Sequence, residues 1–400
     1  MLAVIETHPV QYRAPVYRAV ASQAGLPLTV IYGSDFSVAG YRDPEFGAEF
    51  AWDTDLLSGY ASEFLARTAA GGARSAARVS TRGLARTLRA IQPAAVLLVG
   101  YSPRFHQRAL ATVLWGGWPI LFRGETTDHA LRRGPLRAWL RSAGLRWLYR
   151  RCARLLYVGR RSLEHFRRLR VPDDKLVSSP YCVDVSAFRW AEEDRAALRG
   201  ATRQDLRIES GELVLLFAGK LSTRKGPDVL VRAVRELPVG LRDRARIVFL
   251  GDGALHEELA VLAGMAPRVV TQFLGFQNQA ALSAYYHAAD VLVLPSRQSE
   301  TWGLVVNEAL HHGLPCVVSE AVGCAPDLIR SGVTGEVCAP DSPTSLARAI
   351  ARAERLVGRG EVRQQCRAQV SDYTLRHAAE GIARAYWDVV PAARAVERTA

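Results

Sequence analysis

The sequence predicts an α/β protein with two domains, each built around a parallel sheet. Its 400 residues exceed what a single hydrophobic core usually organises, so two domains are expected. Short apolar runs alternate with longer segments of helical character, which indicates buried strands joined by helices. Such runs occur in both halves of the chain, at residues 2–5, 28–32, 94–100 and 213–218.

The composition is that of a globular protein, with 49% hydrophobic and 23% charged residues, and it excludes a disordered chain. The start, MLAVIETHPVQY, is apolar for only five residues and lacks a basic region, so it predicts a first strand and not a secretory signal. No run approaches the roughly 18 apolar residues of a membrane span. The six cysteines form no C-x-x-C pair, which indicates neither a zinc site nor disulfides. A cytoplasmic setting is expected.

Positive charge is concentrated in the first half of the chain. Residues 1–200 hold 29 Lys and Arg against 17 Asp and Glu, whereas residues 201–400 hold 23 against 22. Within residues 65–170 there are 22 basic and 3 acidic residues, a field that attracts an anionic partner. Arginines at every fourth position from Arg74 to Arg86 predict a ladder along one helical face.

The densest basic segment is residues 132–161, which are expected to be helical. Arginines lie beside and opposite an apolar stripe of Leu136, Trp139, Leu140, Ala143, Trp147, Leu148, Cys152 and Leu155. Two interpretations stay open. The stripe packs on the domain's own sheet with the arginines in solvent, or the helix approaches an anionic membrane or a lipid-diphosphate acceptor through Arg and Trp. A nucleic-acid partner fits less well, and none is expected.

The stretch PSRQSETWGLVVNEA, residues 295–309, follows an apolar strand and opens a helix. Glu300 and Glu308 lie eight positions apart, so one carboxylate precedes the helix and the other lies about two turns inside it. A helix that starts near Trp302 or Gly303 offers free backbone N–H groups to a phosphate. The carboxylates suit sugar hydroxyls, because like charges repel. The stretch therefore predicts a site for a sugar joined to a diphosphate.

Cations flank the loop after strand 213–218. The chain has three lysines against 49 arginines, yet Lys220 and Lys225 fall within six residues of each other, with Arg224 beside them. Gly219 ends the strand, and Gly226-Pro227 suits the start of the next helix. Because lysine is rare elsewhere, this pair predicts phosphate-binding cations and not ordinary solvated side chains.

Polar side chains also follow the strands of the first half. His8 and Gln11 come after the first strand, His106 lies near the start of the helix after strand 94–100, and Glu125 follows the next strand. Since ligands bind at the carboxyl ends of parallel strands, these residues are expected to line the acceptor side of a cleft. A packing role for His8, before Pro9, is equally open.

PSRQSETWGLVVNEAL resembles the E-x7-E signature of the retaining family 4 glycosyltransferases, which have the GT-B fold of two Rossmann-like domains facing each other across a cleft. The resemblance implies that Glu300 contacts the transferred sugar and Glu308 the ribose hydroxyls. Backbone amides of the intervening loop would reach the sugar and phosphates, namely those of Thr301, Trp302, Gly303, Leu304 and Val305.

Residues 219–226 resemble the family's G-[RK]-L…K-G segment, with Lys220 where arginine is commoner. Lys220 and Lys225 would neutralise the donor diphosphate, which makes them catalytic together with Glu300, and Arg224 would bind the donor. The backbone at Phe273, Leu274 and Gly275 would face the nucleobase. At the N-terminus, HPVQY stands where many relatives carry a Gly-Gly loop and resembles one subset of the family.

The resemblance also implies a domain plan. Residues 1–188 would form the acceptor-binding domain and residues 189–370 the nucleotide-sugar domain, with a hinge at 189–211. Residues 371–400 would cross back onto the N-terminal domain as a helix. On this basis we expect a metal-independent retaining transferase that needs no cofactor, because Lys220, Lys225 and Arg224 can meet the charge on a departing diphosphate.

The donor is expected to be a UDP-sugar, or next a GDP-sugar, on family frequency. The acceptor hydroxyl would belong to a lipid-linked or cell-envelope glycan or to a small molecule, and the protein would be cytoplasmic or peripheral on the inner face of the membrane. Two alternatives remain. One is a sugar-nucleotide epimerase on the same fold, and the other is a non-catalytic protein that binds a sugar nucleotide or a membrane surface.

Overall fold

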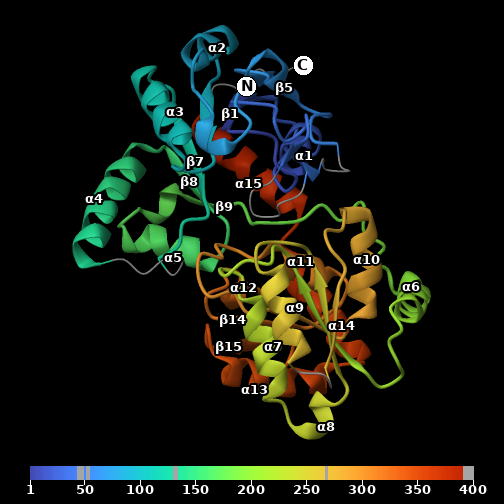
Figure 1. The fold of residues 1–400 in the computed structure, drawn as a ribbon. Coiled ribbons are helices and arrows are strands. Elements are labelled where there is room, and N and C mark those ends of the chain that lie inside the picture. Colours follow the sequence, from blue (N-terminus) through green and yellow to red (C-terminus); the bar gives the residue numbers. More distant parts are fainter. Residues whose placement is uncertain (43–48, 51–54, 129–133, 266–268, 391–400) are drawn as a thin grey trace.

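The computed structural model describes residues 1–42, 49–50, 55–128, 134–265 and 269–390. Two parallel sheets, each covered by helices on both faces, form two domains that appear as upper and lower lobes in Figure 1. This confirms the predicted α/β, two-domain architecture. A short antiparallel pair, β3 (Tyr41–Arg42) and β4 (Glu49–Phe50), lies outside the main sheets.

The N-terminal sheet has the strand order β5-β2-β1-β6-β7-β8-β9. Its strands are β1 (Leu2–Glu6), β2 (Leu28–Tyr32), β5 (Ala61–Phe64), β6 (Ala95–Leu98), β7 (Ile120–Gly124), β8 (Arg154–Tyr157) and β9 (Leu176–Ser178). Its helices are α1 (Ala14–Ser22), α2 (Leu84–Ile91), α3 (Arg104–Trp115), α4 (Pro135–Arg151) and α5 (Arg160–Arg168). The strand order reverses beside β1, which places the loop after β1 at a topological switch point, where ligands bind in open sheets.

The C-terminal sheet has the order β12-β11-β10-β13-β14-β15. Its strands are β10 (Leu213–Ala218), β11 (Ala245–Leu250), β12 (Val270–Phe273), β13 (Val291–Leu294), β14 (Cys316–Ser319) and β15 (Gly335–Cys338). The remaining helices are α6 (Glu192–Asp205), α7 (Pro227–Arg235), α8 (Val239–Arg242), α9 (His256–Gly264), α10 (Gln279–Ala288), α11 (Leu304–His311), α12 (Ala325–Leu328), α13 (Pro343–Ala353), α14 (Gly360–Val370) and α15 (Leu375–Trp387). Here the switch point falls between β10 and β13, so the loops after these strands meet.

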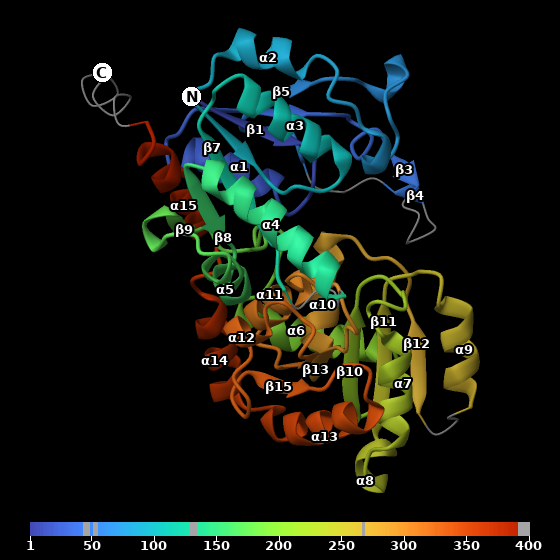
Figure 2. The ribbon, with the colours of Figure 1, turned by 90° about the vertical axis from the view of Figure 1, so that its left-hand side faces the viewer.

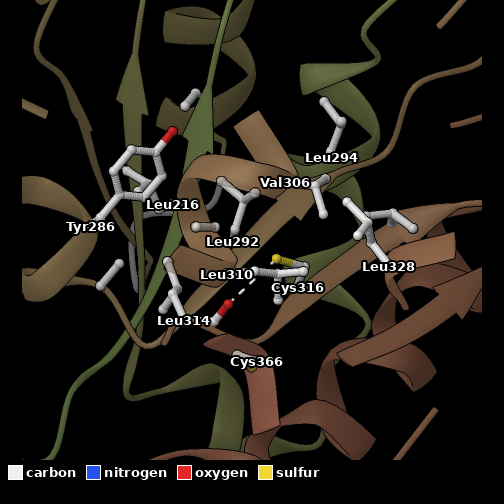
Figure 3. Packing of buried hydrophobic residues seen from close by; sticks show 14 of the residues in the cluster. Leu216, Tyr286, Leu292, Leu294, Val306, Leu310, Leu314, Cys316, Leu328 and Cys366 are labelled. Atoms are coloured by element: carbon white, nitrogen blue, oxygen red, sulfur yellow. Dashed lines mark hydrogen bonds between the residues drawn. The ribbon is translucent and has the colours of Figure 1, made fainter. Parts of the chain in front are cut away.

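The central strands of each sheet, such as β6, β10 and β13, are buried on both faces, which is why they are continuous apolar runs and not alternating ones. Figure 3 shows one core of the C-terminal domain, where side chains of β13 and α11 such as Leu292, Val306 and Leu310 interlock. Tyr286 of α10 belongs to the same cluster. The helix that carries Glu308 is therefore fixed by packing on one side.

The last described helix returns to the N-terminal domain, as the fold prediction required. α15 lies against α1 and the β8–β9 edge in the upper lobe of Figure 1. Ala378, Ala379 and Ile382 are fully buried there, and a Cβ on Gly381 would lie 1.9 Å from the Ser178 carbonyl oxygen. This close approach packs α15 directly against β9 of the N-terminal domain.

One expectation about local structure was wrong. The arginines from Arg74 to Arg86 form no single helical ladder, because α2 begins only at Leu84, after Gly83 has turned the backbone left-handed with φ +90°. Residues 189–211, the expected hinge, contain α6. α6 packs against α10, and Arg199 and Arg203 pair with Asp290 at 2.6 and 3.3 Å, so the segment is part of the C-terminal domain.

Candidate active site

The loop that carries Glu300 is held by backbone contacts with its own domain. The N–H groups of Gly323 and Cys324 donate to the carbonyl oxygens of Glu300 and Trp302, both at 2.9 Å. A Cβ at position 323 would lie 1.8 Å from the Thr301 carbonyl oxygen, so only glycine permits this approach. The geometry of the loop thus depends on a second loop, after β14.

Helix α11 begins where the sequence predicted, at Leu304 with Gly303 as its cap. Gly303 has φ +101°, a conformation that L-residues with a Cβ rarely adopt. The first helical hydrogen bond runs from Val306 N to Gly303 O at 2.9 Å. The N–H groups of Leu304 and Val305 precede it and lie at the positive end of the helix dipole.

Trp302 anchors the loop at the boundary between the domains. Its indole is buried, donates to Asn307 Oδ1 at 2.8 Å and lies against the rings of Tyr181 and Tyr373. Asn307 in turn donates to the Tyr181 carbonyl oxygen at 3.3 Å. Trp302 also lines the cleft, but its indole nitrogen is already engaged in holding the loop in place.

Glu300 is a buried carboxylate that faces cations. Lys225 Nζ lies 2.7 Å from its Oε2, and Arg224 Nη1 lies 3.3 Å from the same oxygen. The Ser296 hydroxyl also donates to this oxygen, at 3.3 Å. Burial raises the pKa of Glu300, but Lys225 and then Arg224 outweigh it, so this pKa lies below its usual value. Glu300 therefore stays ionised at neutral pH and orients Lys225.

Glu308 is also buried, at 2% exposure, but it faces phenols. Tyr286 donates to Oε2 at 2.5 Å, and Tyr12 of the N-terminal domain donates to Oε1 at 3.3 Å. Burial raises the pKa of Glu308 to about 7, because these phenols and the more distant Lys225 compensate only in part. The two glutamates of one helix region thus differ in protonation near neutral pH.

Two adjoining cavities flank these carboxylates, and both are lined by Tyr12 and Val305. The first, of about 250 Å³, lies between the domains at Glu300 and is lined by Lys225, Arg13 and Glu125 as well. The second, of about 100 Å³, lies at Glu308. An elongated ligand could therefore extend from one glutamate past Val305 to the other.

The N-terminal wall of the first cavity is a hydrogen-bonded network of charged side chains. Arg13 pairs with the fully buried Glu6 at 2.8 Å, and Tyr17 also donates to Glu6. Tyr181 donates to Glu125 Oε2 at 2.6 Å. The Thr301 hydroxyl donates to the same oxygen at 3.2 Å, so Glu125 joins the two domains at the cleft.

The predicted acceptor-side residues separate into three environments. Glu125 lines the first cavity, whereas Gln11 lines the second, on the Glu308 side, and its buried Oε1 has no hydrogen-bond partner among the described residues. His8 stacks on Phe36 and bonds to the Thr7 hydroxyl. Burial, then Arg13, lowers the pKa of His8 and of the enclosed His106 to about 4. Both imidazoles are therefore neutral at pH 7.

The predicted donor residues of the second domain divide in a similar way. Gly219 and Val305 line the second cavity, and Lys225 and the segment from Glu300 to Val305 line the first. Lys220 lines neither of these two cavities. Phe273 stacks on Phe249 within a core, and Leu274 and Gly275 continue the sheet through backbone bonds, whereas the neighbouring Phe276 and Gln277 line the second cavity.

Sequence reasoning missed the phenols of the cleft, Tyr12, Tyr181 and Tyr286, and the cation Arg13. They come from three separate segments, with Tyr12 and Arg13 adjacent in one of them, and no spacing marks them. The HPVQY segment did contain Tyr12, but only its contact with Glu308 assigns it a place. In the part of the chain that the structure describes, no group of three or more His, Cys, Asp or Glu side chains could hold a metal ion.

No described helix has the length and apolarity to cross a membrane. Helix α4 does present apolar side chains to solvent. Leu136 and Trp139 are 68% and 66% exposed, and Leu140 and Trp147 are also exposed. Only Leu148 and Cys152 of the predicted stripe's second half, with Leu155 of β8, are buried. The interpretation that the whole stripe packs on the sheet is therefore wrong for its first half.

Comparison with known proteins identifies the second domain. Residues 199–371 match the family described as "Glycosyl transferases group 1", so this part of the chain is a glycosyl transferases group 1 domain. A D-inositol 3-phosphate glycosyltransferase of Actinosynnema mirum is 37% identical over 187 residues, 44% of this chain and 43% of its own. An uncharacterized glycosyltransferase of Methanocaldococcus jannaschii is 35% identical over 153 residues, 38% of each chain. The chain thus spans less than half the length of these relatives.

Solved structures match the chain over its whole length. Sucrose-phosphate synthase from Thermosynechococcus elongatus has a TM-score of 0.69 at 17% identity and covers 98% of this chain and 99% of its own. An Anabaena protein, HepE, solved with UDP-glucose, has a TM-score of 0.60 at 17% identity, covering 100% and 99%. At such identities the likeness shows the fold alone, which is GT-B, as predicted.

Proposed function

We propose that the protein is a retaining glycosyltransferase, resembling family 4 and its HPxQY-containing subset. It would move a sugar from a nucleotide diphosphate sugar to an acceptor hydroxyl. The observation that carries this proposal is the meeting of Lys225, Arg224 and Glu300 at the start of α11, in a cavity between the domains. The group 1 domain that holds this cluster supports it.

The diphosphate of the donor would lie at the N-terminus of α11. The N–H groups of Leu304 and Val305 would bind its oxygens, and Lys225 and Arg224, together with Lys220 after β10, would stabilise the charge that grows as the sugar–phosphate bond breaks. These cations supply the charge that a metal ion supplies elsewhere, so the proposed reaction is metal-independent and uses no cofactor. In this role Glu300 holds Lys225 in place and accepts hydrogen bonds from sugar hydroxyls.

The second cavity would hold the nucleoside. Glu308 would accept the ribose hydroxyls, and the base would lie among the side chains and backbone that follow β11 and β12. We propose a UDP-sugar as donor. A GDP-sugar is the second choice to test.

The proposed chemistry needs no protein nucleophile. The acceptor oxygen would attack the anomeric carbon on the face that the diphosphate leaves. The acceptor's proton would pass to the departing phosphate oxygen, and the anomeric configuration would be retained. The acceptor would enter past Glu125 and Arg13, which form the N-terminal wall of the first cavity.

We further propose that α4 places the enzyme on an anionic membrane on the cytoplasmic side, where a lipid-linked or cell-envelope glycan would be the acceptor. Four exposed apolar side chains share this helix with Arg137, Arg150 and Arg151, the combination that favours the interface of an anionic bilayer. In Figure 2, α4 lies at the front of the molecule. Residues 132 and 133 lie outside the described residues.

A panel of nucleotide sugars tests the donor site. A bound donor should raise the unfolding temperature by mass action, and UDP-sugars should do so more than GDP-sugars. Transfer to a hydroxyl acceptor in the presence of EDTA, with the product's anomeric configuration read by NMR, tests the chemistry. An inverted product, or activity lost to EDTA, contradicts the mechanism. Epimerised donor without transfer favours the epimerase, and binding without turnover favours a non-catalytic protein.

Vesicle binding tests the membrane surface. Sedimentation with phosphatidylglycerol vesicles should retain the wild type, and Trp139→Ser with Leu140→Ser should release most of it while donor binding is unchanged. Trp190→Ser is the matched control, because Trp190 is an exposed tryptophan outside α4. Equal retention of all variants contradicts the proposal.

A further inference from the structure

A second, separate hollow lies at the opposite edge of the C-terminal sheet from the cleft. Residues just before β13 and β14, including Asp290 and Pro315, line it, together with Arg195 of α6 and the segment that starts α14. The donor-side loops, by contrast, follow the carboxyl ends of β10 and β13. Tyr286 lines both this hollow and the cavity at Glu308, so its side chain lies between the hollow and that cavity.

This hollow carries an excess of positive charge in an otherwise neutral half of the chain. Its lining includes Arg195, Arg359 and Arg363 against one carboxylate, Asp290. Asp290 already pairs with two arginines of α6, at 2.6 and 3.3 Å. Glu192 of α6, which is not part of the lining, pairs with Arg363 at 2.9 Å and with a further arginine. Glu361, in the first turn of α14, accepts a hydrogen bond from Gln365. Arg195 and Arg359 are therefore the lining arginines that form no ion pair among the described residues.

Arg195 is the clearest of these cations. It is half-buried, it makes no ion pair or hydrogen bond with any described side chain, and Arg363 and Arg199 are among its nearest charges. Burial, then these two guanidinium groups, lowers the pKa of Arg195. Glu192 and Asp290, the acids that act on Arg195, already pair with other arginines. Holding like charges together with so little counter-charge is unfavourable, and a bound anion would relieve it.

Buried polar atoms in the same lining also lack partners. His287 is 2% exposed; its Nε2 donates to the Arg189 carbonyl oxygen at 2.7 Å, but its Nδ1 has no partner among the described residues. The Nε of Arg363 is buried and equally unpartnered. Native structures pair nearly all such atoms, so two in one charged hollow indicate a missing ligand.

Backbone N–H groups at the start of α14 also favour an anion at this hollow. The hollow lies at the start of α14, an 11-residue helix capped by Arg359, whose first N–H groups have no helical partner. The enclosed space is only about 20 Å³, enough for one oxygen-sized group. A tetrahedral anion would therefore insert one oxygen and leave the rest at the rim, near Arg195 and Arg359.

We propose that this hollow is a binding site for a phosphate group, free or as the monoester of a small metabolite, distinct from the cleft between the domains. Arg195, Arg359 and Arg363 would pair with its oxygens. His287 would take up a proton on Nδ1 as the anion binds and donate it to one of them. This site is independent of the proposed transfer reaction.

Calorimetric titration with inorganic phosphate and with glucose 6-phosphate, without any nucleotide sugar, tests the proposal. Arg195→Gln with Arg359→Gln should weaken binding of at least one probe tenfold or more. Arg348→Gln with Arg355→Gln, two exposed arginines of the same domain, should leave it unchanged. Tighter binding of the monoester identifies a metabolite site, and equal or tighter binding of inorganic phosphate identifies a free-ion site.

The cleft is a competing phosphate site, so each titration is repeated in Lys225→Ala. Binding that persists in Lys225→Ala and is lost in the Arg195 and Arg359 variant supports the proposal, provided that this variant unfolds at the wild-type temperature. Substitution of the half-buried Arg195 alone gives a milder second variant. Binding that only Lys225→Ala removes, or no binding to the wild type at millimolar phosphate, overturns it. Failure here leaves the transferase proposal untouched, because no donor is used.

Discussion

The two domains build their sides of the cleft in different ways. The C-terminal side is mainly a continuous stretch, from Ser296 to Glu308, whose backbone is fixed by Gly303 and by the Gly323 loop, with Lys225 added from the loop after β10. The N-terminal side is assembled from side chains of four separate segments, at Glu6, Arg13, Glu125 and Tyr181, which hold one another by hydrogen bonds and ion pairs.

This difference teaches where substitutions should matter. A side of the cleft that is set by backbone geometry tolerates few changes, because one added atom moves every group in the loop. A side that is set by a network of side chains loses its contacts one at a time, each with a modest effect. The largest effects of mutation are therefore expected in the C-terminal domain.

The largest loss is expected for Lys225→Ala. The substitution removes the cation 2.7 Å from Glu300 and the charge proposed to stabilise the leaving diphosphate, and kcat should fall by about 100-fold or more, since such groups are commonly worth about 3 kcal/mol. Lys175→Ala is the matched control, because Lys175 bonds only to backbone carbonyls of the N-terminal domain. Turnover of Lys225→Ala within threefold of wild type would remove Lys225 from the mechanism.

The sequence predicts the C-terminal side of the cleft better than the N-terminal side. The loop and helix start at Gly303, and the meeting of Lys225 with the loop, could be predicted because strand, glycine and helix signals are local and loops after neighbouring parallel strands converge. The contact of Tyr12 with Glu308 could not, since it joins residues 296 positions apart with no periodic signal. Lys220 and Lys225 look alike in sequence, and only the structure shows that Lys225 lines one of the two cavities whereas Lys220 lines neither.

The same limit applies to Trp302 and to α4. The backbone amide of Trp302 stays a predicted donor ligand, but a motif does not reveal that its ring fills the space beside Tyr181 and Tyr373. Burial against the sheet was one of two open interpretations of the α4 stripe, but only the C-terminal half of α4 is buried, so Leu136 and Trp139 stay exposed. Periodicity identifies an apolar face without identifying what covers it.

Gly323→Ala tests the backbone side of the comparison. Its Cβ would lie 1.8 Å from the Thr301 carbonyl oxygen, so the loop must move, and a displacement near 1 Å can cost up to about 100-fold in rate. Transfer activity should fall by at least about tenfold. Gly144→Ala is the control, because nothing lies within 4 Å of its Cβ in α4, and it should stabilise the helix slightly. Equal activity of the two variants would mean that the loop is not set by this contact.

Glu308 predicts a pH dependence of stability. Its pKa is raised from 4.5 to about 7 in the fold, so the folded protein holds one more proton than the unfolded chain between these values. The free energy of unfolding should therefore fall as pH rises from about 4.5 to 7, by up to about 1.4 kcal/mol per pH unit from this group. Glu308→Gln should lose this slope. The measurement is urea unfolding at several pH values, and parallel curves for both proteins would contradict the assignment.

The same carboxyl predicts a smaller effect on donor binding. Because ribose hydroxyls would donate to the ionised form of Glu308 in the proposed complex, donor affinity should weaken as the pH falls below the pKa of about 7, by at most tenfold per pH unit. Glu300 should contribute nothing in this range, since Lys225 and Arg224 keep its pKa low against burial. Calorimetry of the wild type and Glu308→Gln between pH 6 and 8 checks this, and a pH-independent wild-type Kd would exclude Glu308 as the ribose ligand.

The smallest effect is expected on the N-terminal side, for Tyr12→Phe. The Tyr12 hydroxyl bonds to Glu308 Oε1 at 3.3 Å across the cleft, on the oxygen that a ribose hydroxyl would need. A donor must displace it, and a net hydrogen bond is worth about 1 kcal/mol, so the variant should bind the donor up to about fivefold more tightly. Tyr286→Phe is the informative counterpart, because its 2.5 Å bond to Oε2 orients the carboxylate from within the same domain and its loss should weaken donor binding. If both variants weaken binding equally, Tyr12 assists the donor instead of competing with it, and the two domains hold Glu308 in the same way.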